Sequence, residues 1–159
     1  MKNKSGIFIF LSFALLIFSG CKKDMTDFTF VYTIEKESSY KIECVFNNDQ
    51  TYTISKYKYL SGDVGKEEKP TVTNGVMTET ESEMLKTLIQ GCDFFNLNDT
   101  YKKGVSTDVL YRTYLVVGDK EKTVLLSGED PVNVSFYFDQ LFANVNSFIS
   151  LKTKEEVSL

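Results

Sequence analysis

Carboxylates, lysines, tyrosines and cysteines are the residues of this chain that could do acid–base or nucleophilic chemistry, because it contains no histidine. Without histidine there is no Ser-His-Asp triad, no Cys-His pair and no zinc site of the usual histidine-containing types. Closely spaced carboxylates occur in one expected loop, Glu67-Glu68, and at two expected helix starts, Glu79/Glu81/Glu83 and Glu129-Asp130. Carboxylates near the N-terminus of a helix interact favourably with the helix dipole, so we interpret these groups as structural. We therefore predict that the chain is not an enzyme.

Other polar groups give weaker signals for ligands. Asn96, Asn98 and Asp99 carry oxygens that calcium could use, but they lack the Asp-x-Asp-x-Asp-Gly order of a calcium loop, so we predict a turn. Lys102-Lys103-Gly104 is a small basic cluster in a chain of net charge −4, which disfavours nucleic acid as a partner. We therefore predict no metal and no cofactor.

Two of the three cysteines occupy positions that predict a shared core. Cys44 alternates with Phe46 on one face of an expected strand, and Cys92 follows Leu88 on one stripe of an expected helix. A disulfide between Cys44 and Cys92 would fit an oxidising compartment. Two buried, reduced thiols that act as small hydrophobic residues are the alternative.

The first twenty residues are arranged as a signal peptide. Lys2 and Lys4 precede an apolar stretch from Ile7 to Phe18, and Ser19-Gly20-Cys21 follows. The apolar stretch is shorter than the roughly 20 residues that a membrane-spanning helix needs. We predict that residues 1–20 are a cleaved leader; an uncleaved anchor is the alternative.

Cys21, directly after the small residues Ser19 and Gly20, resembles the lipobox of bacterial lipoproteins. In that family a diacylglyceryl group is attached to the cysteine and cleavage occurs before it. Phe18 stands where leucine is commonest, although both are bulky and apolar. The resemblance implies that acylated Cys21 binds membrane lipid in a bacterial cell envelope; an ordinary secreted protein is the alternative.

Residues 21–27 are predicted to be a short tether between the lipid and the folded domain. In the lipoproteins that this leader resembles, Asp after the modified cysteine often signals inner-membrane retention, and Lys22 stands there instead. The outer membrane is therefore the expected location. Lys22-Lys23-Asp24 also resembles the short charged export signals of Bacteroidota surface lipoproteins. A solvated tether beside anionic headgroups explains the same residues.

Alternating aromatic and β-branched residues predict a series of short strands. They are expected at Phe28–Glu35, Tyr40–Phe46, Thr51–Leu60, Thr71–Met77, Val109–Val117 and Thr123–Leu126. In the third, Tyr52 and Ile54 share one face while Tyr57 and Tyr59 share the other. Either a bulge near Ser55 resets the register, or one tyrosine pair is exposed.

Two amphipathic helices complete the expected fold. Thr80-Glu81-Ser82-Glu83 has the form of a capping box and Gly91 is a plausible stop, while Asp130-Pro131 is a strong start for a second helix. Residues 98–106 are expected to be a polar loop. The order predicts a two-layer α+β domain over residues 28–151, an antiparallel sheet of about five to six strands with both helices on one face, and a tail at 152–159.

The whole mature region, from Ser39-Tyr40-Lys41-Ile42 onward, resembles an uncharacterised family of bacterial envelope domains of unknown function, and the similarity spans most of the chain. The shared motifs are the hairpin at Asn48-Asp49, the Glu-rich helix start, Asp93-Phe94-Phe95-Asn96-Leu97 followed by Tyr101, Asp108 before the Tyr-rich strand, and Glu121-Lys122-Thr123-Val124. The resemblance implies a fold and an envelope location, and it provides no catalytic or binding residue.

Four tyrosines on expected strands, Tyr57, Tyr59, Tyr111 and Tyr114, are the candidate binding surface. Tyrosine combines apolar area with a hydroxyl and is enriched at recognition surfaces, although it is also simply a good strand residue. Tyr111 and Tyr114 must point to opposite faces of a regular strand. We predict a non-enzymatic, lipid-anchored module that binds a protein or a glycan. The alternative is an immunity or inhibitor protein whose acidic surface occludes a basic effector.

Overall fold

The computed structural model describes residues 25–36, 39–59, 69–102, 109–127 and 135–154. The predicted leader 1–20, Cys21 and most of the predicted tether lie outside these residues. No helix in the part of the chain that is described is both long and apolar enough to cross a bilayer.

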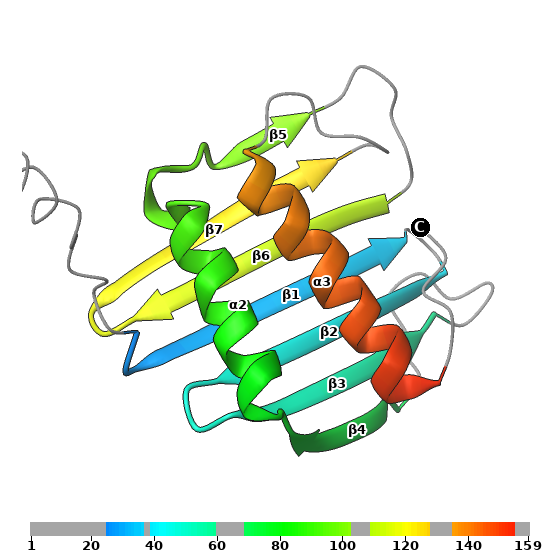
Figure 1. The fold of residues 1–159 in the computed structure, drawn as a ribbon. Coiled ribbons are helices and arrows are strands. Elements are labelled where there is room, and N and C mark those ends of the chain that lie inside the picture. The colour runs from blue at the N-terminus through cyan, green and yellow to red at the C-terminus, as the bar shows by residue number, and fades with distance from the viewer. Residues whose placement is uncertain (1–24, 37–38, 60–68, 103–108, 128–134, 155–159) are drawn as a thin grey trace, which may run out of the picture.

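A seven-stranded sheet forms one layer of the fold, and two helices form the other (Figure 1). The strand order is β4-β3-β2-β1-β6-β7-β5, and all pairs are antiparallel except β5 with β7. The strands are β1 (Phe28–Lys36), β2 (Tyr40–Asn47), β3 (Thr51–Lys58), β4 (Thr71–Val76), β5 (Thr100–Lys102), β6 (Val109–Val117) and β7 (Lys120–Ser127). The α+β class is confirmed, but the sheet has seven strands rather than five to six.

The additional strand, β5, lies in the segment that was expected to be a polar loop. It pairs in parallel with β7 from Thr100 opposite Leu125 to Lys102 opposite Ser127. The backbone N–H of Leu125 also donates to the carbonyl of Asp99 at 2.9 Å. Three residues are too few to show an alternating pattern, so β5 depends on the edge that β7 offers.

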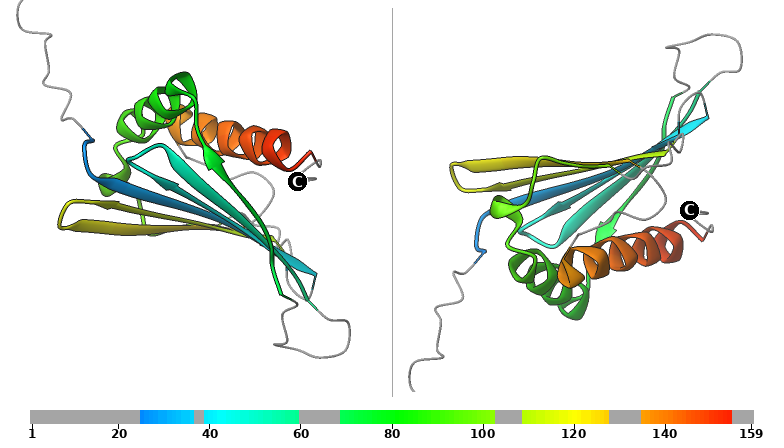
Figure 2. Two further views of the ribbon diagram at one scale, coloured as in Figure 1. Left: turned by 90° about the horizontal axis from the view of Figure 1, so that it is seen from below. Right: turned by 90° about the horizontal axis from the view of Figure 1, so that it is seen from above.

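The core lies between the helix layer and one face of the sheet, and Figure 2 shows both helices against that same face. Alternate residues of β1 and β2 are buried there, and aromatic rings of both strands meet those of the second helix, α3 (Phe136–Thr153). The ring centroids of Tyr32 and Phe142 are 5.1 Å apart, and those of Phe46 and Phe148 are 5.2 Å apart. The other face of the sheet is covered by no helix of the described chain.

The first described helix, α2 (Glu79–Gly91), ends at the predicted glycine, but its N-cap is Thr78, two residues before the predicted cap at Thr80. The N–H of Glu81 donates to the Thr78 hydroxyl at 3.2 Å, and the N–H of Thr78 donates to the Glu81 carboxylate at 2.8 Å. The predicted capping box at Thr80 was therefore wrong. Thr78 and Thr80 both precede a glutamate by three residues, so spacing alone did not distinguish them.

The N-terminus of α3 is also displaced from its predicted position. Ser135 is the N-cap, and its hydroxyl accepts a hydrogen bond from the N–H of Phe138 at 3.3 Å. Asp130-Pro131 lies outside the described residues, and the helix begins after it. At its other end the helix continues to Thr153, into the predicted tail, and residues 155–159 are not described.

The chain is held to the fold from Thr26 onward. The Asn48 side-chain amide donates to the Thr26 carbonyl at 3.0 Å, and the N–H of Gly118 donates to the Asp27 carbonyl at 3.2 Å. Gly118 has a φ of +60° in the turn between β6 and β7, a conformation that glycine adopts without steric cost. β6 and β7 pair as a hairpin on either side of this turn, and the turn also holds Asp27 at the edge of the fold.

Candidate functional site

The candidate site is the open face of the sheet, defined as the face opposite α2 and α3. Residues directly across antiparallel strands point to the same side, so the register assigns each side chain to a face. Thr33 of β1 lies opposite Glu43 of β2 and Arg112 of β6, and Val31 lies opposite Val45 and Tyr114. Because Phe30 and Tyr32 are buried under the helices, these odd-numbered β1 residues and their partners form the open face.

Tyr57 and Tyr59 lie together at one end of the open face. The pairing of β3 with β2 runs without interruption from Lys58 opposite Tyr40 to Tyr52 opposite Phe46, so the alternative of a bulge near Ser55 is wrong. Both rings are half-buried. The uninterrupted register therefore places the tyrosine pair on the uncovered face, which was the second alternative.

Two neighbouring charged side chains set the surroundings of these rings. The Lys41 ammonium lies 4.8 Å from the centroid of the Tyr57 ring, within cation–π distance. The Tyr59 hydroxyl donates to the Glu35 carboxylate at 2.8 Å. Lys41 also lies 3.9 Å from Glu43, a long ion pair. The rings are thus held in place by contacts that leave part of each ring exposed.

Tyr114 lies on the same face but far from this pair. Three strand steps across the sheet and four residues along it separate Tyr114 from Tyr57, which corresponds to roughly 20 Å. The Tyr114 hydroxyl donates to Glu121 at 2.6 Å, and this hydrogen bond raises the pKa of Tyr114, because the carboxylate favours the protonated phenol. The open face therefore carries two separate aromatic positions.

Tyr111 does not belong to the candidate surface, and its inclusion was wrong. It lies on the helix-covered face of β6, where its ring centroid is 6.4 Å from that of Tyr32 and 5.7 Å from that of Phe142. The sequence already required Tyr111 and Tyr114 to point apart. It could not indicate which of them the helices would cover.

Arg112 is a residue of the open face that the sequence analysis overlooked. It is exposed at mid-sheet, between Thr33 of β1 and Leu125 of β7, and it forms no ion pair with any described residue. Thr33, which lies between Arg112 and Glu43 on neighbouring strands, is only 7% exposed. A single arginine within a strand does not stand out in the sequence. Arg112 is central only because the strand order places β6 in the middle of the sheet.

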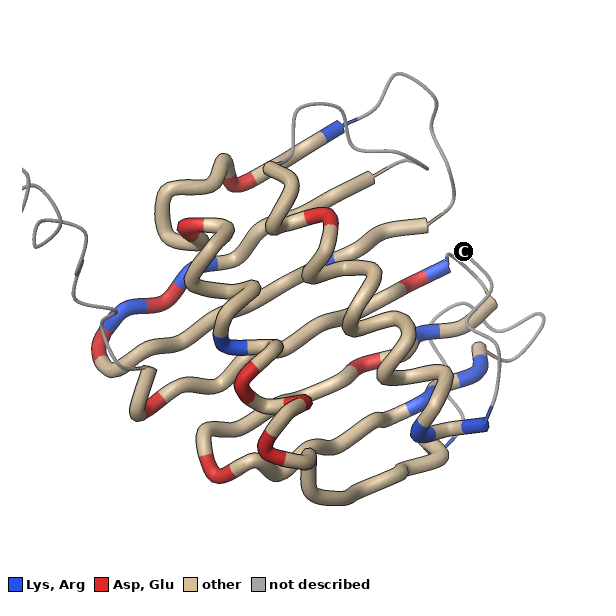
Figure 3. The backbone as a smooth tube through the Cα atoms, viewed as in Figure 1, with Lys and Arg blue, Asp and Glu red and all other residues tan. Residues whose placement is uncertain are grey.

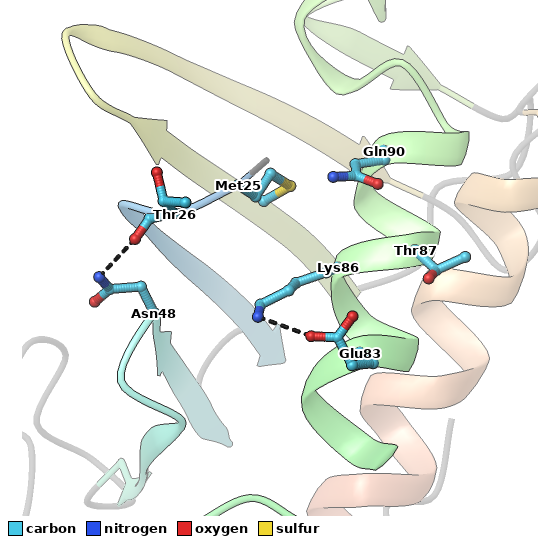
Figure 4. Close-up of a pocket in the computed structure, with 7 residues that line it drawn as sticks. All are labelled: Met25, Thr26, Asn48, Glu83, Lys86, Thr87 and Gln90. Carbon is cyan, nitrogen blue, oxygen red and sulfur yellow. Dashed lines mark hydrogen bonds and ion pairs between the residues drawn. The ribbon is translucent and has the colours of Figure 1, made fainter. Parts of the chain in front are cut away.

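The cavity of the helix layer is a separate, polar feature (Figure 4). It encloses about 250 Å³ between α2, the turn after β2 and the start of the described chain. The Lys86 ammonium and the Glu83 carboxylate in its lining are 3.0 Å apart and paired with each other. Thr26, Asn48 and Gln90 add hydroxyl and amide groups. The lining therefore offers hydrogen-bonding groups but no net charge, because Glu83 and Lys86 neutralise each other.

Cys44 and Cys92 are both buried, free thiols in this structure. Burial raises the pKa of the Cys44 thiol well above its ordinary value, and burial also raises the pKa of Cys92 to about 12. The Cys92 thiol donates to the Ile89 carbonyl at 3.1 Å. Both groups are therefore protonated at neutral pH and poor nucleophiles.

The remaining sequence candidates are either occupied structurally or not described. Glu81 caps α2 and lies 2.8 Å from the Lys152 ammonium, and Asp99 lies 2.7 Å from Lys122. Asn96 donates to Asp93 at 2.8 Å, and no group of three or more Cys, Asp or Glu in the described ranges could hold a metal ion. Cys21, Glu67-Glu68, Lys103-Gly104 and Glu129-Asp130 lie outside the described residues.

Comparison with known proteins adds no assignment to this geometry. No protein-family model matches the chain, and no curated protein matches it.

Proposed function

We propose that this protein is a non-enzymatic binding module, attached to a bacterial cell envelope by lipid on Cys21, which captures a protein through the open face of its sheet. The observation that carries the proposal is the layering: both helices cover one face, and the other presents Tyr57, Tyr59, Tyr114 and Arg112. Antiparallel sheets can leave one face to solvent, and tyrosine and arginine are the residues enriched at protein interfaces.

A protein fits this face better than a small ligand. The tyrosine pair and Tyr114 are separated by roughly 20 Å, which a single sugar does not span but a protein surface does. The 250 Å³ cavity belongs to the helix layer and is not part of this face. A glycan remains the alternative ligand, because an exposed tyrosine ring can stack on a sugar.

A non-enzymatic role is supported by the chemistry at hand. The chain has no histidine. On the open face, Glu35 accepts from Tyr59, Glu121 accepts from Tyr114 and Glu43 lies beside Lys41. General acid–base catalysis needs a titrating group that faces the substrate, and each of these carboxylates is already engaged. Turnover of any substrate by the purified chain would contradict the proposal.

The anchor and the location are tested directly by mass spectrometry of the chain purified from membranes. We expect an amino-terminal Cys21 with attached acyl chains, because the leader has the lipobox order of bulky, small, small and cysteine. Fractionation should place the protein in the outer membrane. An intact leader, or an unmodified Cys21, would contradict lipid anchoring and leave the binding proposal standing.

The binding face is tested by crosslinking in intact cells with matched tyrosine variants. Tyr57→Ala and Tyr59→Ala should each reduce capture of the partner about tenfold or more, if these rings anchor the interface. Tyr137→Ala is the control, because Tyr137 is an exposed tyrosine of the helix layer. Equal capture by all three variants would remove Tyr57 and Tyr59 from the binding site. A toxin as the captured partner would support the immunity alternative.

A further inference from the structure

Strand β4 forms one edge of the sheet, and its outer side pairs with no strand of the described chain (Figure 1). Its inner side pairs with β3 without interruption, from Thr71 opposite Lys56 to Val76 opposite Thr51. The outer N–H and C=O groups of such a strand are a template for another strand. The opposite edge is different, because β5 has only three residues and includes Lys102.

Proteins normally protect an edge strand with charges, proline, a bulge or shortness. The β4 sequence, Thr-Val-Thr-Asn-Gly-Val, contains no charged residue and no proline. Val72 is 50% exposed and Val76 is 64% exposed, and both point to the open face with Asn74 between them. The strand therefore has the features of an edge that is paired in the working protein.

The charges around β4 indicate what pairs with it. Lys56 and Lys69 lie at the end where β4 begins, and Asp49 and Glu79 lie at the end where it finishes; Glu81, at that same end, is already paired with Lys152. Figure 3 shows this separation, with lysines at one end of β3 and β4 and carboxylates at the other. An antiparallel copy of the same strand would place each basic end against an acidic end. A second copy of this chain is thus the electrostatically matched partner.

We propose that two copies of the chain pair through β4, antiparallel and about a two-fold axis, to form one continuous sheet. Residues directly opposite must share a face, so the register that covers the exposed valines places Asn74 opposite Asn74 of the second copy. Val72 then lies opposite Val76 of the second copy, and the reverse pair forms by symmetry. The two open faces become one surface.

The pairing should be weak in dilute solution and stronger on a membrane. Two strands of six residues bury less area than the roughly 1,200 Å² of a standard stable interface. Confinement to a bilayer raises the effective concentration of the second copy. The strand pairing itself does not depend on the function proposed for the open face.

Cysteine crosslinking of the full chain in membranes tests both the contact and its register. Opposite residues have Cα atoms about 4.5–5.5 Å apart, within the range of a disulfide, whereas two copies of residue 72 would lie about 14 Å apart. We expect Asn74→Cys to form a disulfide-linked dimer on mild oxidation. Val72→Cys and Val76→Cys should crosslink when co-expressed and not when expressed singly. The unaltered chain measures the background from its own three cysteines.

Asn74→Lys supplies a second test, because it sets two like charges directly opposite each other on the axis. It should reduce crosslinking of the co-expressed Val72→Cys and Val76→Cys chains several-fold. Leu151→Lys is the control, since Leu151 is 70% exposed on α3, and it should leave crosslinking unchanged. Equal crosslinking at positions 72, 74 and 76 in singly expressed chains, crosslinking to a different protein, or no dimer at all would overturn the proposal.

Discussion

At the scale of single residues, a buried hydrogen bond joins the sheet to the helix layer. The Tyr32 hydroxyl of β1 donates to the side-chain carbonyl of Asn146 of α3 at 2.9 Å. Tyr32 is fully buried and Asn146 is 9% exposed, so water cannot replace the contact. Tyr32→Phe should therefore lower the free energy of unfolding by about 1–3 kcal/mol, because it leaves the Asn146 amide buried without its partner. Urea denaturation measures the loss.

The matched control for that substitution is Tyr57→Phe on the open face, which should change the free energy of unfolding by less than about 0.5 kcal/mol. Combining Tyr32→Phe with Asn146→Leu should recover part of the loss, since both polar groups are then removed. Equal losses for Tyr32→Phe and Tyr57→Phe would show that the Tyr32 hydrogen bond contributes little.

The two buried cysteines give a second prediction at this scale. Cys44 and Cys92 should not react with a thiol reagent in the native protein, because burial keeps both thiols protonated and covered. Both should react once the chain is denatured without reductant. A denatured chain that releases these thiols only after reduction would instead contain the Cys44–Cys92 disulfide.

At the scale of elements, the start of α2 shows how two overlapping signals are resolved. Thr78 and Thr80 each precede a glutamate by three residues, but only Thr78 has the extended backbone and the reciprocal hydrogen bonds of a cap. Thr78→Ala should lower the free energy of unfolding by about 1 kcal/mol. Thr80→Ala should have little effect, because Thr80 is an exposed first-turn residue of the helix. Thermal or urea unfolding distinguishes the two, and a reversed order would restore the cap at Thr80.

Elements also differ in how far their own sequences specify them. The hairpin at Gly118 follows from a glycine that adopts a positive φ, and the long strands follow from their alternation. The strand β5 follows from neither, because three residues next to a polar loop become a strand only when β7 is beside them. Its parallel pairing with β7 likewise depends on the path of the chain between the two strands, which no local sequence pattern specifies.

At the scale of the whole molecule, the buried phenol of Tyr32 and the buried thiols of Cys44 and Cys92 make the free energy of unfolding depend on pH. Burial raises the pKa values of Tyr32 and Cys44, and burial raises that of Cys92 from 9.0 to about 12. Above pH 9 the unfolded chain therefore binds fewer protons than the folded chain, and stability falls as pH rises. The fall should approach about 1.4 kcal/mol per pH unit for each group that ionises only on unfolding.

The control for this alkaline effect is Cys92→Ala, which should make the dependence of the unfolding free energy on pH less steep. Denaturant midpoints measured at neutral and at alkaline pH provide the comparison, and no change in midpoint would contradict the buried-thiol account. At acid pH the dependence of the unfolding free energy on pH has the opposite sign. Burial opposes ionisation of Glu81, but hydrogen bonds from Lys152 and Thr78 outweigh it and lower the pKa, so its contribution is lost as pH falls through that pKa.

The sequence by itself determined local features of this protein: the alternating strands, the presence of two amphipathic helices and the α+β class. These follow from backbone preferences and hydrophobic periodicity, which act over a few residues. It also required Tyr111 and Tyr114 to point apart, and it predicted a leader that ends directly before Cys21.

Only the tertiary structure decided which face the helices cover, and hence that Tyr111 is buried while Tyr57, Tyr59 and Tyr114 lie on the open face. Only the strand order placed Arg112 at mid-sheet and left β4 at an edge. The physical reason is that periodicity states which residues share a face, whereas the packing of distant rings such as Phe142 and Phe148 selects the face to be buried.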